Sequence, residues 1–485
     1  MQDAVLHERR ELGTLLRAVV KIIAVSDPPD YEQPWQTCGS STSSGSGVVV
    51  DTAAGLRVLT NAHCIQNHVF VEVRRYGKAK NYVAKVVAVG HECDLALLDV
   101  EDERFFHGVE PIPLGSLPEL SDRVSVCGYP VGGERLSITE GIVSRIEVLR
   151  YAQRRRRLLA VQIDAAINDG NSGGPVLLGG ELVGVAFQAL EDAQQIGYMI
   201  SVPVIEHFLA DVDAGVTPGF PELGVHSVPL ESAAHRRMLG LCGEHDNGVL
   251  VARVTFEGSA WGVLREGDVI LEIDGLPITS DGTVPLREGE WVTYEHAITC
   301  RHAGESVSIR VWRDHAELSC MVALRAPSHL VTEDTYDVRP SYFIFGGLLF
   351  VPLTRDYLKT WGEQWWQSAP HNLMSLYEGG IPTEERQEVV VMQKALADEV
   401  NRGYHDCESV VIVEACGVRW RSLAHLVEIV DAVRGEYVTF LASDGRPIVI
   451  DRQVAISRSR SILERFGVPR DRSADLPNLS VQTAL

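Results

Sequence analysis

The stretch LAVQIDAAINDGNSGGPVLLGGELVGVAFQ (residues 159–188) places a glycine-rich turn between valine-containing strands. Glycine adds no side chain to a core and weakens regular elements, but it lets the backbone turn tightly and approach other groups closely. Ser172 stands in this turn, within INDGNSGGP (167–175). One use of such a turn is a nucleophile whose neighbouring N–H groups hold an oxyanion. The alternative is a surface turn, so the partners of a catalytic serine have to be found elsewhere in the chain.

Short valine-rich strands with turn signals between them run from residue 18 to residue 212. This spacing indicates a barrel or sandwich rather than alternating strands and helices. The expected strands include 18–25, 47–50, 57–60, 69–75, 82–90, 95–100, 123–130, 159–164 and 182–188. Beyond a linker-like break at 213–221, two smaller mixed units follow, and a second break at 325–340 separates them.

The composition describes a globular, acidic chain. Of its 485 residues, 45% are hydrophobic and 23% charged, and the formal charge is −22, which argues against a nucleic-acid binder because such a protein needs a basic surface. No apolar run approaches the roughly 20 residues of a membrane-spanning helix. The segment 1–16 lacks the apolar core of a signal peptide. Nine cysteines without a C-x-x-C pair favour a reducing compartment.

A serine hydroxyl is a weak nucleophile until a base takes its proton, and histidine is the usual base. Of the sixteen histidines, His63 follows a valine-rich strand in the small-residue turn LTNAHC (59–64); taken alone, it is also compatible with a surface histidine. A carboxylate that orients the imidazole completes a triad. Asp94, just before an apolar run, is the candidate, and Asp99 within that run is the alternative.

Four tracts carry a resemblance to a known family: TNAHC (60–64), CDLALL (93–98), DAAINDGNSGGPV (164–176) and VGVAFQ (183–188). Together they resemble the Deg/HtrA serine proteases, which have a chymotrypsin-like double β-barrel. The resemblance implies that His63, Asp94 and Ser172 form the catalytic triad. It also implies that the backbone amides of Gly170 and Ser172 form the oxyanion hole, which gives the glycines beside the serine a function.

The resemblance extends beyond the protease region. REGDVILEIDG (265–275) is similar to the core of a PDZ domain of this family, and GTVPLR (282–287), PSYFIFGGLLF (340–350) and FGVPRDRSADL (466–476) resemble the plant-type branch with two PDZ domains. The expected fold class is therefore mainly β, with a chymotrypsin-like double β-barrel protease domain followed by two mixed α/β PDZ-like domains. The expected domains are an N-terminal helix (1–16), a trypsin-like serine protease domain (17–215), PDZ domain 1 (222–326), PDZ-like domain 2 (340–455) and a C-terminal helix and tail (456–485).

A PDZ domain holds the carboxylate of a peptide on a glycine-led loop and pairs the peptide with the next strand. The resemblance implies that two loops do this, and each is otherwise only a strand with a glycine at its start. Their residues are Leu223, Gly224 and Val225 in PDZ domain 1, and Gly347, Leu348, Leu349 and Phe350 in PDZ-like domain 2.

The resemblance also implies a substrate pocket, with a floor near Ala166 and Ile167 and a wall near Ala186 and Phe187. None of these residues is acidic, so a buried lysine or arginine of the substrate would have no counter-charge. We expect cleavage after valine, alanine or isoleucine. Asn171 stands where the digestive relatives have an aspartate that pairs with a new N-terminus, so activation by reversible loop ordering is expected instead.

The basic run YAQRRRRLL (151–159) contains Arg154, Arg155, Arg156 and Arg157. It lies where the family has a regulatory sensor loop; the alternative is a solvated loop. Because four adjacent arginines repel one another, we expect the loop to become ordered only with acidic partners. The candidate partners are LREGEWVTYE (286–295) and GEHD (243–246).

No metal or other cofactor is expected. Cys64 beside His63, GHEC (90–93) and CGEH (242–245) lack paired ligand spacing. Tyr31 and Trp35 are either core anchors or subunit contacts, because the family trimerises through N-terminal aromatic residues.

The sequence thus predicts an ATP-independent serine endopeptidase that degrades unfolded or damaged proteins and is regulated by its PDZ domains. Its expected partners are unfolded protein or peptide substrates and further copies of itself, in trimers or multiples of them. The cytoplasm or the chloroplast stroma is the expected location. The alternative is a peptide-binding chaperone or scaffold whose protease barrel is inactive at rest.

Overall fold

The computed structural model describes residues 13–130, 133, 135–151, 156–168, 170–187, 197–217, 219–241 and 247–477. They form two compact units. Unit 1 contains residues up to Asp27 and Ser40–Pro327, and unit 2 contains Pro28–Gly39 and the residues from Ser328 onward. No helix among the described residues has the length and apolarity needed to cross a membrane.

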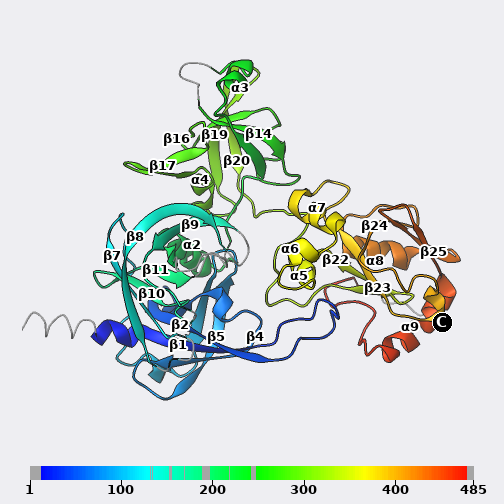
Figure 1. Ribbon diagram of the computed structural model, residues 1–485, viewed down its shortest axis with the longest axis horizontal. Helices are drawn as coiled ribbons and strands as arrows, with labels where there is room; N and C mark the ends of the chain where they lie inside the picture. Colours follow the sequence, from blue (N-terminus) through cyan, green and yellow to red (C-terminus); the bar gives the residue numbers. More distant parts are fainter. Residues whose placement is uncertain are drawn as a thin grey trace, which may run out of the picture. The chain divides into compact units, whose positions relative to one another are not determined.

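Unit 1 contains two closed six-stranded β-barrels (Figure 1). The first has the order β1-β2-β3-β6-β5-β4, with β1 (Val19–Ser26), β2 (Ser41–Thr52), β3 (Gly55–Thr60), β4 (His68–Arg75), β5 (Asn81–Gly90) and β6 (Leu95–Val100). The sequence of β4 fits a strand with one face toward the barrel core: Val71 and Val73 are buried, whereas Phe70 is 44% exposed. Closure leaves no edge strand. The 3₁₀-helices η1 (Leu16–Ala18), η2 (Ala62–Cys64) and η3 (Glu103–Phe105) accompany this barrel.

The second barrel has the order β10-β11-β12-β9-β8-β7. Its strands are β7 (Arg123–Gly128), β8 (Ser137–Arg150), β9 (Arg157–Ile163), β10 (Pro175–Leu178), β11 (Glu181–Phe187) and β12 (Gly197–Ser201), and α2 (Val202–Asp213) follows. Helix α2 packs against β9, β11 and β12. The expected strands of both barrels are present within a few residues of their predicted positions. The expected N-terminal helix (1–16) lies largely outside the described residues.

The rest of unit 1 covers most of the region expected as PDZ domain 1. Its main sheet has the order β13-β14-β15-β19-β20. The elements are β13 (Val225–Pro229), α3 (Ala233–Met238), β14 (Val249–Val254), β15 (Val269–Ile273), β16 (Leu276–Pro277), β17 (Thr283–Arg287), β18 (Glu290–Thr293), α4 (His296–Thr299), β19 (Ser306–Arg313) and β20 (Ala316–Ala323).

Unit 2 is built on a six-stranded sheet of order β21-β22-β23-β24-β25-β26. Its elements are β21 (Phe343–Phe345), β22 (Leu348–Pro352), α5 (Arg355–Lys359), α6 (Trp365–Ser368), α7 (His371–Gly379), β23 (Val390–Ala395), η5 (Glu399–Asn401), β24 (Val410–Ala415), α8 (Leu423–Ala432), β25 (Tyr437–Ala442), β26 (Pro447–Asp451) and α9 (Arg452–Arg465). Strands β22 to β26 repeat the order of β13, β14, β15, β19 and β20, and in both sheets a helix precedes the fourth of these strands. Strand β21 is an addition outside β22.

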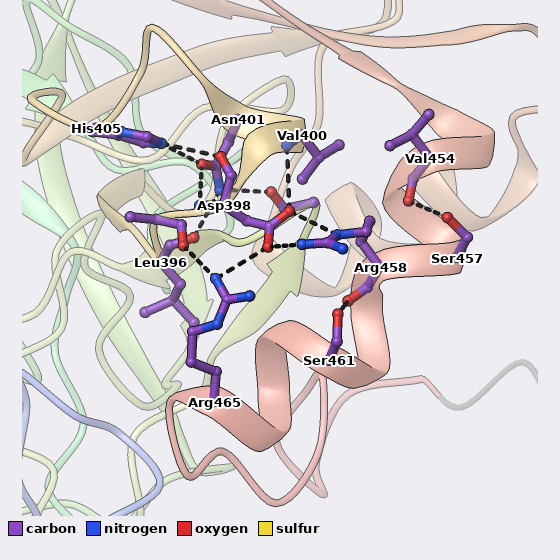
Figure 2. A network of polar contacts seen from close by, with 12 residues as sticks. Leu396, Asp398, Val400, Asn401, His405, Val454, Ser457, Arg458, Ser461 and Arg465 are labelled. Atoms are coloured by element: carbon purple, nitrogen blue, oxygen red, sulfur yellow. Dashed lines mark hydrogen bonds and ion pairs between the residues drawn. The ribbon is translucent and has the colours of Figure 1, made fainter.

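The C-terminal helix α9 is held to unit 2 by the polar network that Figure 2 shows around Asp398. The guanidinium of Arg458 donates two hydrogen bonds to this buried carboxylate, at 2.6 and 3.0 Å, and Arg465 donates a third at 3.2 Å. Hydrogen bonding to Arg458 lowers the pKa of Asp398 to about 2. Asn401, in the same network, donates to the carbonyl oxygen of Gly346 in the turn between β21 and β22.

The aromatic residues near the N-terminus lie in the core of unit 2. The Trp35 ring is buried and meets the Tyr342 ring edge-on, with 5.6 Å between the ring centroids. The Tyr31 hydroxyl donates to Asp356 at 2.9 Å. Of the two interpretations, the structure of this chain shows core anchors.

Candidate active site

His63 and Asp94 lie together at one end of the first barrel. The Nδ1 atom of His63 is 2.7 Å from Oδ2 of Asp94, and the His63 backbone N–H donates to Oδ1 at 2.9 Å. One carboxylate thus fixes both the ring and the backbone of the histidine. Asp99, the alternative, is 42% exposed and pairs with Arg57 on the outside of the barrel.

The local chain path explains how Asp94 reaches this position. Its φ of 55° lies in the left-handed region, which is uncommon for a residue other than glycine. Its backbone carbonyl accepts from the Ala62 N–H at 3.1 Å and from the Asn61 side-chain amide at 2.9 Å. These bonds hold the loop between β5 and β6 against η2, which carries His63. They also compensate for the strained backbone of Asp94.

Ser172 lies in the turn between β9 and β10 of the second barrel and is partly buried. Its hydroxyl makes no hydrogen bond to another described residue, as in resting sites where catalytic hydrogen bonds form only with substrate. Its carbonyl oxygen accepts from the Ser46 N–H at 2.9 Å and lies 3.6 Å from Sγ of Cys64. The serine turn therefore adjoins the turn that carries His63.

The amides around Ser172 divide into two groups. Those of Asn171, Gly173 and Gly174 donate to the carbonyls of Asn168, Ala186 and Asn171. Those of Gly170 and Ser172 have no acceptor among the described residues. Two free N–H groups on either side of one buried residue are the arrangement an oxyanion hole requires.

Ser46 is a residue that the sequence analysis missed. It is fully buried, and its hydroxyl donates to the Gly170 carbonyl and accepts from the Tyr129 N–H, both at 2.7 Å. Ser46 therefore fixes the peptide group between Gly170 and Asn171, directly after the Gly170 N–H. Ser46 sits in the serine-rich run STSSGSG (41–47), where nothing distinguishes it from its neighbours.

Asn171 is 2% exposed, and its side-chain oxygen has no hydrogen-bond partner among the described residues.

Thr60 and Asn61, both buried, belong to TNAHC, but no role was predicted for them. Thr60 donates to the Ser46 carbonyl at 2.6 Å. The polar residues behind the site thus position one another.

The electrostatics of His63 are set by two opposing effects. Burial is the largest single effect and lowers the pKa of His63, but the charge and hydrogen bond of Asp94 together with the neighbouring Cys64 outweigh it and hold the pKa well above its ordinary value. A neutral imidazole is needed to take a proton from serine, so this shift decides the pH at which the base becomes available.

The predicted pocket residues lie around the serine turn. Ala166 is exposed, Ile167 is partly buried, and Ala186 is fully buried on β11. The Phe187 ring packs into the core against Tyr151, with ring centroids 4.8 Å apart, so only its backbone can line a pocket wall.

The two predicted peptide-binding loops differ in their surroundings. The amides of Leu223 and Gly224 have no acceptor among the described residues, and β13, which begins at Val225, has a neighbouring strand on one side only. By contrast, Gly346 and Gly347 form the turn of the β21–β22 hairpin. Because β22 pairs with β21 and with β23, the strand that contains Leu348, Leu349 and Phe350 has no free edge.

The basic run is described in part, because Arg154 and Arg155 lie outside the described residues. Arg156 is buried, with ion pairs to Glu92 at 3.4 Å and Glu222 at 3.3 Å, and it donates to the Phe220 carbonyl at 2.7 Å. Arg157 is half exposed and pairs with Glu295 at 3.2 Å. Both arginines contact residues outside the second barrel.

Comparison with known proteins gives matches to two family models. Residues 45–185 match the trypsin-like peptidase domain, and residues 331–475 match a PDZ domain. Protease Do-like 2, chloroplastic, of Arabidopsis thaliana is 39% identical over 468 residues, which cover 96% of this chain and 76% of that protein. Putative protease Do-like 3, mitochondrial, of the same plant is 36% identical over 462 residues, 95% of this chain and 80% of that protein.

Solved structures of HtrA-type proteases are similar to this chain. The HtrA-type protease AlgW with tripeptide has 25% sequence identity and a TM-score of 0.50, with 66% of this chain and 97% of that chain covered. Strand order, family models and relatives thus agree on a trypsin-like double barrel followed by PDZ-type domains.

Replacing Asp94 by asparagine tests the His63–Asp94 pair. The amide cannot hold His63 in the right tautomer, so we expect kcat/KM on a fluorogenic peptide to fall by about 10⁴-fold. The rate rises with pH as His63 loses its proton. Removing the negative charge lowers the pKa of His63, so this rise should shift to lower pH in Asp94→Asn.

The matched control is Asp99→Asn, which changes a partly exposed carboxylate on the next strand and should leave the pH profile unchanged. A loss of less than tenfold in Asp94→Asn, or an equal loss in Asp99→Asn, would contradict the assignment.

Proposed function

The chain belongs to the Deg/HtrA family of serine proteases, and from this premise we propose that His63, Asp94 and Ser172 carry its endopeptidase chemistry. The observation that supports the proposal is the His63–Asp94 pair beside a serine turn with two free amides. The alternative of a chaperone with an idle barrel has no comparable support, since the named relatives are proteases.

The reaction follows from these positions. His63 takes the proton of the Ser172 hydroxyl as its oxygen attacks the scissile carbonyl, and later gives that proton to the leaving amine. Asp94 holds the imidazole in place and stabilises its charged form. The Gly170 and Ser172 amides donate to the oxyanion as charge develops on it. The acyl-enzyme is then hydrolysed by water that His63 deprotonates.

We propose that PDZ domain 1 captures the substrate chain. A peptide can add as a strand beside β13, while the Leu223 and Gly224 amides hold its terminal carboxylate. For Gly347, Leu348, Leu349 and Phe350 the same role requires β21 to leave β22. Peptide capture in PDZ-like domain 2 therefore costs more than capture in PDZ domain 1.

We propose that Arg154, Arg155, Arg156 and Arg157 form the regulatory segment. Arg156 and Arg157 support this, because they join the start of β9, the strand that precedes the serine turn, to the linker and to PDZ domain 1. Exposed pairs such as Arg157–Glu295 each contribute about 0–1 kcal/mol and weaken in salt. Buried Arg156 is instead a structural clamp.

The substrates are unfolded or damaged proteins, and cleavage is independent of ATP. The active assembly is a homo-oligomer, a trimer or a multiple of it. Of the two expected locations, the chloroplast stroma is the one consistent with a relative, protease Do-like 2, which is named as chloroplastic; the other relative, protease Do-like 3, is named as mitochondrial. These assignments rest on the family.

Replacing Ser172 by alanine should abolish casein cleavage, with a loss of at least about 10³-fold in rate. It removes one partly buried hydroxyl, so folding and peptide binding should be unchanged. The measurement is casein turnover beside circular dichroism. Ser457→Ala, which removes a surface hydroxyl from α9, should keep full activity. Normal turnover by Ser172→Ala would exclude the assignment.

The pocket proposal predicts cleavage after valine, alanine or isoleucine, because Ala166, Ile167, Ala186 and Phe187 offer no counter-charge to a basic side chain. Mass spectrometry of casein fragments gives the cleavage sites. Ala166→Asp places a carboxylate at an exposed position of the floor and should raise the share of cleavage after lysine and arginine. Dominant cleavage after basic residues by the unmodified protein would refute the pocket.

Replacing Arg154, Arg155 and Arg157 by serine, with Arg156 kept, should lower the rate on a short peptide by up to about fivefold. Salt should slow the unmodified protein more than the variant, because exposed ion pairs are screened. Arg419→Ser, which removes an exposed pair in unit 2, is the control. Identical rates and salt responses for all three proteins would reduce the segment to a solvated loop.

A further inference from the structure

Three side chains of the types that bind metal ions meet within unit 1, and none of them belongs to the candidate active site. His207 and Asp211 are four residues apart on α2, so both lie on one face of the helix. His302 comes from the loop between α4 and β19, in PDZ domain 1. One possible ligand atom from each residue lies within 4.8 Å of those of the other two.

The Asp211 carboxylate is the centre of this cluster. Its Oδ1 is 2.6 Å from Nδ1 of His302, its Oδ2 is 3.5 Å from Nε2 of His207, and Oδ2 accepts from the Gly219 N–H at 3.2 Å. The side chain is 8% exposed, and no lysine or arginine among the described residues forms an ion pair with it. A buried carboxylate needs a compensating positive charge, and the described residues place only imidazoles within ion-pair distance of it.

The imidazole of His207 is buried and rigidly placed. It stacks between the rings of Phe220 and His302, with centroids 4.1 and 4.0 Å away.

Hydrogen bonding within the described residues does not satisfy His207. If Nε2 carries the proton, it donates to the Gly219 carbonyl at 3.1 Å, and the buried Nδ1 has no partner. If Nδ1 carries the proton, the Nε2 lone pair faces the oxygens of Gly219 and Asp211. The second arrangement brings three electron-pair donors together with no proton between them, and a bound cation would compensate all three.

We propose that His207, Asp211 and His302 bind a divalent transition-metal ion of the zinc class and thereby tie PDZ domain 1 to the last helix of the protease domain. Zinc takes imidazole nitrogen and carboxylate oxygen at about 2.0–2.2 Å, so tetrahedral ligand atoms lie about 3.3–3.5 Å apart. The 3.5 Å between His207 and Asp211 fits this spacing. His302, 35% exposed, has to move from Asp211 by less than about 1 Å, and water or the Gly219 carbonyl completes the set.

No sequence motif could reveal this site. His207 and Asp211 have helical spacing, but the third ligand follows 91 residues after Asp211. The expectation that no metal binds rested on paired ligands close together in the chain. Here the fold brings the third ligand to the other two.

The test uses full-length protein with Ser172→Ala, so that self-cleavage cannot interfere, after chelation and dialysis. Addition of Co²⁺ should give one visible-absorbing ion per chain, without the thiolate charge-transfer band that the cysteines would produce. Zn²⁺ should displace it, and hydrogen exchange in α2 and in 300–305 should slow when Zn²⁺ is bound.

Asp211→Asn and His302→Ala should each weaken Co²⁺ binding at least tenfold and abolish the effect of Zn²⁺ on exchange. Both leave the core intact, since one is isosteric and the other changes a partly exposed ring. His107→Ala, which removes an exposed histidine of the protease domain, should bind as the parent does. The proposal would be overturned if the parent did not bind one Co²⁺ ion per chain, or if the Asp211 and His302 variants bound Co²⁺ as tightly as the parent does.

Discussion

The active site depends on the contact that Ser46 makes between the two barrels. Its backbone N–H donates to the carbonyl of Ser172 at 2.9 Å, and its hydroxyl donates to the carbonyl of Gly170 at 2.7 Å. Strand β2 of the first barrel thereby holds the serine turn of the second. His63 and Asp94 are fixed to each other within the first barrel, so the Ser46 bonds set where Ser172 lies relative to His63. Because Ser46 is fully buried, its hydrogen bonds lie in a low-dielectric environment, where they are stronger than in water.

The glycines around Ser172 follow from the same contact. A Cβ on Gly173 would lie 2.1 Å from the Ser46 carbonyl oxygen, and one on Gly174 would lie 2.1 Å from that of Cys127. On the facing strand, a Cβ on Gly45 would lie 2.6 Å from Sγ of Cys64. At Gly173 the backbones of the two barrels approach so closely that no side chain fits between them, whereas Gly174 meets β7 of its own barrel and Gly45 meets η2. The pattern in INDGNSGGP therefore reflects close packing of the barrels as well as space for an oxyanion.

The two PDZ-type sheets share one strand order but differ in whether the edge of the first strand is open. In PDZ domain 1, β13 has an open edge beside two free amides, whereas in unit 2 the added strand β21 covers the corresponding edge of β22. Phe343 of β21 is buried in the same cluster as Leu426 and Val427 of α8, so the hairpin has a hydrophobic anchor. Moving β21 would expose that ring to water, which costs about 1.5–3 kcal/mol. The order of strands alone therefore does not decide which domain takes a peptide.

Local sequence determined the barrel strands, the serine turn and the family, because valine-rich alternation and glycine-rich turns act over a few residues. His63, Asp94 and Ser172, which we propose as the catalytic residues, were singled out for the same reason, since each stands near the end of a strand in a distinctive tract. Ser46 was not, because its role comes from residues 124 positions away. The same holds for the burial of Arg156, the covered edge of β22 and the joining of His302 to Asp211. These features arise from contacts between elements far apart in the chain, and such contacts leave no periodic or compositional trace, so only the tertiary structure decided them.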